Sequence, residues 1–360
     1  MSHQIKNQKI LITGGGGFIG SHLTEILALE NEIILYDTDF QNNCIQYSEL
    51  THAGNVTRIQ GDILDFNKLL TVIEDVNIVI HAAAVVGVRN VITQPRMTLE
   101  VNFIGTMNVL KASLKARRLD RILYFSTSEI FGRDAFRVSE DSLSSIGSNT
   151  NQRWCYAIGK VSGEHLVQSY HREFGTPTVI VRPFNVFGPK RIGEHAVKIF
   201  MMQALMGKNL IVLGDGSQIR SWCYIDDFIE AMLRCLVLPE AIGNSFNIGN
   251  PINTLTIHDL ARKIIDICNS TSKIVFKKPD YTDIDLRVPD TSKARNILDF
   301  HPAVLMDEGL LHSKEWYASN LDQIPYDAFY DDFNGNGQKK QIKVDFPGKK
   351  QFDTAVLLAN

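Results

Sequence analysis

The chain has 360 residues, of which 44% are hydrophobic and 21% are charged, and its formal net charge is −3. This composition predicts a large globular core, and the near-neutral charge excludes the broad basic surface that nucleic-acid binding requires. The polar first residues, MSHQIKNQ, and the lack of an apolar run of about 18 residues predict neither a signal peptide nor a membrane span. We therefore expect a cytoplasmic protein without a membrane partner.

The first half of the chain alternates short apolar runs with helical patterns. Strands are predicted over 9–13, 32–37, 56–62, 77–83, 121–127 and 177–183, and helices over 21–30, 66–75, 99–116 and 159–174. The strand segments are rich in β-branched residues and apolar throughout, which is typical of a parallel sheet covered on both faces. We predict an α/β fold with a Rossmann-like, doubly wound parallel sheet.

The pattern changes after about residue 185, where glycine and proline become frequent. Short strands over 209–215 and 245–249 alternate there with short helices, which predicts a smaller C-terminal α/β substrate lobe. The expected division is a first domain over 1–185, the lobe over 186–320, with some crossing of the chain between them, and an extension of unknown role over 321–360.

The segment TGGGGFIG (13–20) lies between the first strand and the first helix. Its spacing fits G-x-G-x-x-G from Gly15 or G-x-x-G-x-x-G from Gly14. In either case the backbone turns tightly beside a helix that begins near Phe18, and the free N–H groups of that helix attract a pyrophosphate. The segment predicts a dinucleotide-binding turn.

Two acidic residues end the next strands. Asp37 ends the second strand, where a carboxylate accepts hydrogen bonds from the adenosine ribose and repels a 2′-phosphate, so NAD is favoured over NADP. Asp62 ends the third strand, where it either contacts the adenine or caps the following helix. Both interpretations of Asp62 stay open.

Tyr156 and Lys160 form Y-x-x-x-K on a predicted helix, so that both side chains lie on one face. A phenol has an ordinary pKa of about 10, too high for a base at neutral pH, and we expect the neighbouring ammonium to lower it. The pair follows the end of the fifth strand, where ligands collect in such sheets. The pattern predicts proton removal from a substrate hydroxyl.

Six motifs occur in order: TGGGGFIG, GDILD, HAAA (81–84), STSEIFG (126–132), Tyr156-x-x-x-Lys160 and RPFNVFGP (182–189). Together they resemble the extended short-chain dehydrogenase/reductase family, and more narrowly its NAD-dependent nucleotide-sugar epimerases, dehydratases and decarboxylases. The resemblance covers roughly residues 8–315. It selects the spacing that begins at Gly14, leaves Gly15 and Gly16 as spacers, and implies a nucleotide-sugar substrate, with UDP as the expected carrier.

The family's roles transfer to matching positions. The residues implied to bind NAD are Gly14, Gly17, Phe18, Ile19, Gly20, Asp37, Asp62, Ile63, Ala82, Ala83, Ala84, Asn102, Tyr156, Lys160 and Pro183. The residues implied to bind the nucleotide sugar are Val86, Arg89, Asn185, Lys198, Arg220 and Arg287. The resemblance also implies a first step in which Tyr156 takes the proton of the sugar C4 hydroxyl, giving a 4-ketone.

The residues after Thr127 bear on the second step. Dehydratases of the family carry an Asp-Glu pair there and simple epimerases carry small or neutral residues, whereas this chain carries Ser128 and Glu129. The Ser-Glu pair resembles the UDP-glucuronate decarboxylases, in which the 4-keto-uronate is a β-keto acid that loses CO2. Arg287 matches an arginine that those enzymes place near the substrate carboxylate, and Arg89 and Arg96 are further candidates for that contact.

Decarboxylation is the favoured hypothesis, and three alternatives stay open. Ser128 and Glu129 would also suit a dehydratase acting on UDP-N-acetylglucosamine with Glu129 as base. Glu129 argues against a simple epimerase, but a nucleotide-sugar 4-epimerase, such as one acting on a uronate, stays open. The remote alternative is a catalytically silent NAD-binding scaffold. The resemblance further implies a homodimer in which the helices over 99–116 and 157–172 pair into a four-helix bundle. The five scattered cysteines predict free thiols in a reducing compartment and no metal site.

Overall fold

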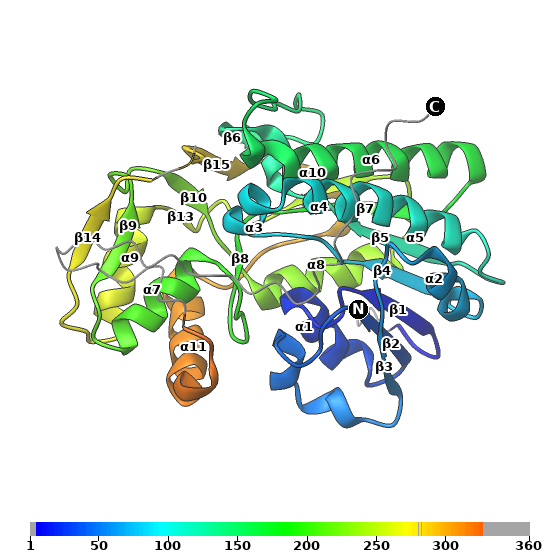
Figure 1. The fold of residues 1–360 in the computed structure, drawn as a ribbon, viewed down its shortest axis with the longest axis horizontal. Coiled ribbons are helices and arrows are strands. Elements are labelled where there is room, and N and C mark those ends of the chain that lie inside the picture. Colours follow the sequence, from blue (N-terminus) through cyan, green and yellow to red (C-terminus); the bar gives the residue numbers. More distant parts are fainter. Residues whose placement is uncertain (1–4, 280, 282, 327–360) are drawn as a thin grey trace, which may run out of the picture.

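The computed structural model describes residues 5–279, 281 and 283–326. In this part of the chain, seven parallel strands form one sheet in the order β12-β7-β5-β4-β1-β2-β3 (Figure 1). The strands are β1 (Lys9–Thr13), β2 (Glu32–Asp37), β3 (Val56–Gln60), β4 (Ile78–His81), β5 (Arg121–Phe125), β7 (Thr178–Pro183) and β12 (Ser245–Ile248). The predicted Rossmann-like, doubly wound sheet is confirmed.

Helices cover both faces of this sheet, which is why its strands are apolar throughout. They are α1 (Phe18–Leu27) and α8 (Ile225–Val237) on one face, and α2 (Phe66–Ile73), α5 (Thr106–Ser113) and α6 (Cys155–Phe174) on the other. Within β1, Ile10 and Ile12 join the core beneath α1, whereas Leu11 joins the core beneath α2. All three side chains are fully buried.

The helix predicted over 99–116 is interrupted. The chain forms α3 (Val88–Thr93), α4 (Pro95–Leu99), a π-helical segment (Glu100–Gly105) and α5, which ends at Ser113. Asn102 lies in the π-helical segment, and its side-chain amide both accepts from the backbone N–H of Val85 and donates to the backbone carbonyl of Val85. The widened turn therefore coincides with a contact that fixes the loop after β4.

The smaller lobe contains a mixed sheet, two short strand pairs and several helices (left in Figure 1). The mixed sheet has the order β13 (Thr254–Thr256), β10 (Ile219–Ser221), β15 (Leu286–Pro289) and β6 (Asp134–Val138). The pairs are β8 (Val186–Phe187) with β11 (Cys223–Tyr224), and β9 (Leu210–Leu213) with β14 (Ile274–Lys277). The helices of the lobe are α7 (Ala196–Leu205), α9 (Ile257–Ile267) and α11 (Met306–Ser319), whereas α10 (Ser292–Leu298) packs against β12 and α8 of the large-sheet part. Short 3-10 turns occupy Cys44–Tyr47, Glu49–His52, Ser128–Phe131, Gln152–Trp154, Pro239–Ala241 and Leu321–Gln323.

The chain crosses between the two parts in both directions. The strand predicted over 245–249 was expected in the smaller lobe, but β12 is an edge strand of the large sheet and pairs in parallel with β7. Conversely, β6 comes from the first part of the chain and pairs with β15 in the lobe. Strand pairing over such separations leaves no local pattern in the sequence, which is why the expectation for 245–249 was wrong.

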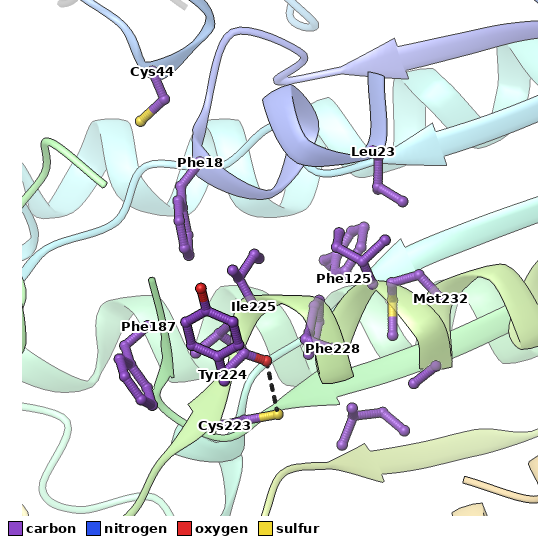
Figure 2. Close-up of a cluster of buried hydrophobic side chains, with 14 of the residues drawn as sticks. Phe18, Leu23, Cys44, Phe125, Phe187, Cys223, Tyr224, Ile225, Phe228 and Met232 are labelled. Atoms are coloured by element: carbon purple, nitrogen blue, oxygen red, sulfur yellow. Dashed lines mark hydrogen bonds between the residues drawn. The ribbon is translucent and has the colours of Figure 1, made fainter. Parts of the chain in front are cut away.

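A buried aromatic cluster joins the large sheet to the lobe. Figure 2 shows Phe18 from α1, Phe125 from β5, Phe228 from α8, and Phe187 with Tyr224 from the β8–β11 pair. The ring centroids of Phe125 and Phe228 lie 6.1 Å apart, and those of Phe187 and Tyr224 lie 5.6 Å apart. Because each buried aromatic side chain contributes roughly 1.5–3 kcal/mol, the cluster fixes the start of the lobe against the helix that follows the glycine turn.

The described start of the C-terminal extension packs against the rest of the protein. The hydroxyl of Tyr47 donates to the backbone carbonyl of Gln323, and Ile324 is buried. The rest of the extension, 327–360, lies outside the described residues. Among the residues that are described, no helix combines the length and apolar character needed to cross a bilayer.

Candidate active site

The four glycines after β1 form a turn with little room for side chains. Gly14 has a φ of +70°, and a Cβ on it would lie 2.5 Å from the backbone nitrogen of Ala83. A Cβ on Gly20 would lie 2.8 Å from the carbonyl oxygen of Gly14. Gly15 and Gly16 are not spacers as expected, because a Cβ on either would come within 2.8 Å of a neighbouring atom. The turn is a cradle that brings backbone close to a ligand.

Helix α1 begins directly after this turn, at Phe18. Its N-cap residue, Gly17, offers no side-chain hydrogen bond, and no acidic residue lies in the first turn. The first N–H groups of the helix therefore point toward the turn without a capping side chain, and a pyrophosphate satisfies such groups. The residues present thus fit the dinucleotide that the sequence predicts, with Ile19 half-buried beside Phe18.

Asp37 lies at the end of β2, directly beside the glycine turn. Its carboxylate accepts from the backbone N–H of Gly16 at 2.9 Å and from that of Asp39 at 3.3 Å. Burial raises the pKa of Asp37, although these hydrogen bonds oppose the shift. The side chain is half-buried, at the position expected for a ribose contact.

The cap of α2 is Asp65, whose carboxylate accepts from the backbone N–H of Lys68 at 3.0 Å. The interpretation of Asp62 as the helix cap is therefore wrong, and an adenine contact stays a prediction for it. Asp62 instead accepts from the N–H of Leu64 at 2.9 Å. The neighbouring Ile63 is buried against the π-helical segment, where a Cβ on Gly105 would lie 2.4 Å from its side chain.

The HAAA segment follows β4 and lies next to the glycine turn, at the carboxyl ends of these neighbouring parallel strands. Ala82, Ala83 and Ala84 are half-buried, and Ala83 faces Gly14 closely enough to exclude a side chain there. Asn102 is fully buried and holds Val85, so it positions this loop rather than presenting its amide freely. Pro183 ends β7 and is half-buried beside β12.

Thr127, Tyr156 and Lys160 gather where β5 ends and α6 begins. Thr127 is buried and caps the short 3-10 turn by accepting from the backbone N–H of Glu129 at 3.2 Å. Lys160 is buried and donates to the backbone carbonyl of Phe125 at 2.7 Å. Burial lowers the pKa of Lys160 to about 7.

The expected lowering of the pKa of Tyr156 is wrong for the protein alone. Burial raises this pKa, and the charge of Glu129 raises it further, whereas the hydrogen bond with Thr127 lowers it. The physical reason is that the Lys160 ammonium is held by the carbonyl of Phe125, so desolvation of the phenol dominates.

Glu129 is held by Arg153, which is not among the predicted site residues. The two Nη atoms of Arg153 donate to the two carboxylate oxygens of Glu129, at 2.5 and 2.8 Å. The side chain of Arg153 is 4% exposed and that of Glu129 is 22% exposed. Burial alone would raise the pKa of Glu129, but Arg153, with Arg287 and Arg220, lowers it. The sequence offered no local signal for this contact, because Arg153 belongs to no motif and Glu129 lies 24 residues earlier.

Arg287 lies in β15 and reaches the end of β5. It donates to the hydroxyl of Ser128 at 3.1 Å and to the carbonyl of Gly132 at 2.7 Å, while its Nε has no partner among the described residues. Burial lowers the pKa of Arg287 to about 9. Arg220 pairs with Arg287 across β10 and β15, and its guanidinium faces Asp283 at 3.5 Å. Strand pairing thus brings two predicted arginines together beside Ser128 and Glu129.

Other predicted substrate residues lie apart from this cluster or are already bonded. Arg89 faces Glu194 at 3.9 Å, and Arg96 pairs with Glu100 at 2.5 Å while 81% of its side chain is exposed. The remaining predicted residues are Val86, which is half exposed, Asn185, which donates to the carbonyl of Ser221, and Lys198, which donates to the carbonyl of Pro325. The expectation that Arg96 contacts a substrate carboxylate is not met, because its side chain lies on the surface.

Comparison with known proteins gives a consistent result. Residues 10–249 match the NAD dependent epimerase/dehydratase family. A UDP-N-acetyl-alpha-D-glucosaminuronate decarboxylase from Bacillus cytotoxicus is 35% identical over 320 residues, covering 86% of this chain and 98% of its own length. UDP-glucuronic acid decarboxylase 3 of Arabidopsis thaliana is 32% identical over 322 residues, covering 88% and 90%. The structure of a UDP-glucuronic acid 4-epimerase from Bacillus cereus, in complex with UDP-glucuronic acid and NAD, is 32% identical with a TM-score of 0.78 and covers 87% and 99%.

Proposed function

The chain belongs to the NAD dependent epimerase/dehydratase family, and we propose that within it the protein is a decarboxylase of a UDP-linked hexuronate. It is an NAD-dependent enzyme that acts on a nucleotide sugar. UDP-glucuronate is the first substrate to test, and UDP-N-acetylglucosaminuronate, the sugar named for the Bacillus cytotoxicus relative, is the second.

The observation that carries this proposal is the contact between Arg287 and Ser128. A buried guanidinium with an unpartnered Nε lies beside a hydroxyl, in the turn that follows β5 and is capped by Thr127. A guanidinium and a hydroxyl together suit a carboxylate, which accepts several hydrogen bonds. Arg220 and Arg153 add positive charge, which favours an anionic sugar over a neutral one.

The first step is oxidation at the sugar C4. When bound, NAD⁺ supplies the hydride acceptor for this step and can return the hydride at the end. Tyr156 removes the proton of the C4 hydroxyl, Thr127 orients that hydroxyl, and Lys160 lies one helical turn after Tyr156 on α6, where the family pattern expects a positive charge. The glycine turn and the first turn of α1 hold the dinucleotide by its pyrophosphate.

The second step is loss of the carboxyl group. The 4-keto-uronate is a β-keto acid, so its C5–C6 bond breaks to release CO2, and the bonding electrons move to the C4 oxygen as an enolate. Protonation at C5 then gives the 4-keto-pentose nucleotide. Arg287 and Ser128 hold the departing carboxylate in one orientation, which is the contribution the chain makes to this step.

The state of Glu129 favours decarboxylation over dehydration. Dehydration across C5 and C6 requires a base strong enough to remove the C5 proton, and the strength of a base falls with its pKa. Arg153 lowers the pKa of Glu129 and occupies both carboxylate oxygens, and Ser128 provides no acidic proton for a C6 hydroxyl. A 4-epimerase of the same uronate is the second candidate, because its substrate carries the same carboxylate.

Product analysis tests the proposal. The enzyme is incubated with NAD⁺ and with each UDP-uronate in turn, and the nucleotide products are measured by mass spectrometry. The proposal predicts a product lighter by one CO2 with at least one of the two sugars. A product of unchanged mass identifies a 4-epimerase, and the absence of turnover with either uronate contradicts the proposed substrate class.

We also propose a cytoplasmic homodimer. The segment from α4 through the π-helical turn exposes Met97, Phe103 and Ile104, which are 42%, 38% and 40% exposed. An apolar patch on helices that pack beside α6 supports pairing with a second copy of the same helices. The five cysteines are free thiols, which supports a reducing compartment. Light scattering after size exclusion should give twice the monomer mass, and a monomer would contradict the dimer.

A further inference from the structure

One arginine of the loop between β8 and α7, Arg191, is half-buried without an acidic partner. The guanidinium carbon of Arg191 lies 5.0 Å from the centroid of the Phe18 ring, and Phe18 is the first residue of α1. Its Nη1 makes one long hydrogen bond, of 3.3 Å, to the carbonyl of Val186, and its Nε has no partner among the described residues. Within the described chain, no carboxylate forms an ion pair with it.

Other enclosed arginines are better satisfied than Arg191. Arg121 and Arg287 have no carboxylate partner, but each makes two hydrogen bonds of 2.7–3.1 Å. Arg153 and Arg182 each bind a glutamate with two hydrogen bonds, and Arg220 faces Asp283. A half-buried positive charge with one long hydrogen bond and no counter-charge is poorly satisfied, and a ligand that supplies negative charge would stabilise it. Arg191 therefore points to an anion that comes from outside the chain.

The loop that carries Arg191 is attached to α1 and to α11, so the guanidinium is held in place. His22 donates from its Nε2 to the carbonyl of Pro189 at 3.1 Å, and Lys190 forms an ion pair with Glu25. The hydroxyl of Tyr317 donates to the backbone carbonyl of Arg191 at 2.7 Å. These contacts leave the side chain over the first residue of α1.

The surroundings of Arg191 indicate which anion it meets. Helix α1 begins at Phe18, whose ring lies beneath the guanidinium, and no side chain caps its N-terminus. The turn at Cys44 also lies near Arg191, and it is tied to the glycine turn because the N–H of Ile45 donates to the carbonyl of Gly16 at 3.0 Å. We infer that Arg191 binds the pyrophosphate of the NAD dinucleotide together with the backbone N–H groups of the glycine turn. This inference is independent of whether the second step is decarboxylation.

Both ligands of the enzyme carry a diphosphate, so the test separates them. Arg191→Met, Arg191→Lys and the control Arg262→Met, which changes an exposed arginine of α9, are titrated with NAD⁺ and separately with UDP by calorimetry. Arg191→Met should weaken NAD⁺ binding by about ten- to a hundredfold, the expected loss for a hydrogen-bonded charge, and Arg191→Lys should retain part of the affinity. UDP affinity should change by less than about twofold, because Arg191 is inferred to contact NAD and not UDP. Arg262→Met should leave both affinities unchanged, which controls for the loss of an arginine elsewhere on the protein.

Two further readouts separate ligand binding from a structural role. The salt dependence of NAD⁺ affinity should weaken in Arg191→Met, because one charge contact is removed. The melting temperature of the ligand-free variant should not fall, since an uncompensated charge has been removed. Unchanged NAD⁺ affinity overturns the inference, as does a loss of UDP affinity with NAD⁺ affinity retained. If Arg191→Met does not fold, Arg191→Lys provides the test. NAD⁺ affinity equal to that of the native protein, in an Arg191→Lys variant of unchanged melting temperature, would contradict the inference.

Discussion

The guanidinium of Arg153 holds the carboxylate of Glu129 with two parallel hydrogen bonds, of 2.5 and 2.8 Å. The pair forms between the end of β5 and the start of α6, next to Thr127 and Tyr156. This pair keeps Glu129 ionised, because the positive charges of Arg153, Arg287 and Arg220 lower the pKa of Glu129. Glu129 is therefore better suited to fixing the geometry beside the substrate carboxylate than to removing a proton from carbon.

Glu129→Gln should spare oxidation and slow the step that follows. The amide keeps the size of the side chain but removes the charge that pairs with Arg153, so the guanidinium loses its fixed position. We expect the 4-keto intermediate and reduced cofactor to accumulate in a single turnover, with overall turnover lower by about ten- to a hundredfold. Absorbance of the reduced cofactor follows the first step, and mass spectrometry follows the second. Full turnover in this variant would contradict the role of Glu129.

A double-mutant cycle should show strong coupling between the two residues in stability. Arg153→Met leaves a largely enclosed carboxylate without its partner and should reduce the free energy of unfolding by about 3 kcal/mol. Adding Glu129→Gln removes that isolated charge, so the double variant should regain part of the loss, with a coupling of about 1–3 kcal/mol. Urea denaturation of the four proteins measures the cycle. Additive effects would mean that the pair contributes no net interaction.

Arg287→Met should lower kcat/KM for a UDP-uronate by about ten- to a hundredfold while leaving binding of UDP alone nearly unchanged. The guanidinium contacts Ser128 and is expected to meet the sugar carboxylate, not the nucleotide base. The matched control is Arg295→Met, an exposed arginine of α10. Steady-state kinetics of pentose formation and calorimetry with UDP provide the two measurements. Equal activity in native enzyme and variant would remove Arg287 from the site.

Lys160 should make the stability of the ligand-free protein depend on pH. Its pKa is about 7 in the folded protein, whereas an unfolded chain has a lysine pKa of about 10.4. Between these values the unfolded state binds more protons, so the free energy of unfolding rises with pH, and this gain is lost progressively as pH falls from about 10.4 to about 7. The difference between native protein and Lys160→Met should therefore grow in favour of the native protein from neutral to alkaline pH. Lys68→Met, at an exposed lysine, should show no such trend.

Gly14→Ala should abolish NAD⁺ binding and destabilise the protein. The new Cβ would lie 2.5 Å from the nitrogen of Ala83, and the φ of +70° is unfavourable for alanine, so we expect a loss of about 1–3 kcal/mol. Gly54→Ala is the control, because a Cβ there meets nothing within 4 Å. Thermal unfolding and NAD⁺ titration measure both effects. Normal NAD⁺ affinity in Gly14→Ala would contradict the assignment of the turn.

Local patterns predicted the large sheet and the cofactor turn well. The buried run Ile10–Ile12 and its counterparts identify the strands, because a parallel sheet buried on both faces needs apolar residues at successive positions. The first helix begins at Phe18 as predicted, since four glycines cannot continue a strand and leave the following N–H groups free. The strands and the start of the first helix depend on residues that are neighbours in the sequence, so the sequence predicts them.

Features that depend on distant residues could not be predicted. The position of β12 beside β7 and the adjacency of Arg220 and Arg287 are fixed by strand pairing between remote segments. The raised pKa of Tyr156 depends on burial, which the Y-x-x-x-K spacing does not report. Arg153 carries no motif of its own, and its importance emerges only from its contact with Glu129.

The most direct test of the proposed function follows the carboxyl carbon itself. UDP-glucuronate and UDP-N-acetylglucosaminuronate, each labelled isotopically at C6, are incubated with the enzyme and NAD⁺ in a sealed vessel. We expect labelled CO2 to be released from one of them in a one-to-one ratio with an unlabelled pentose nucleotide, and Arg287→Met to release it far more slowly. Turnover that retains the label at C6 of the product would contradict the proposed function.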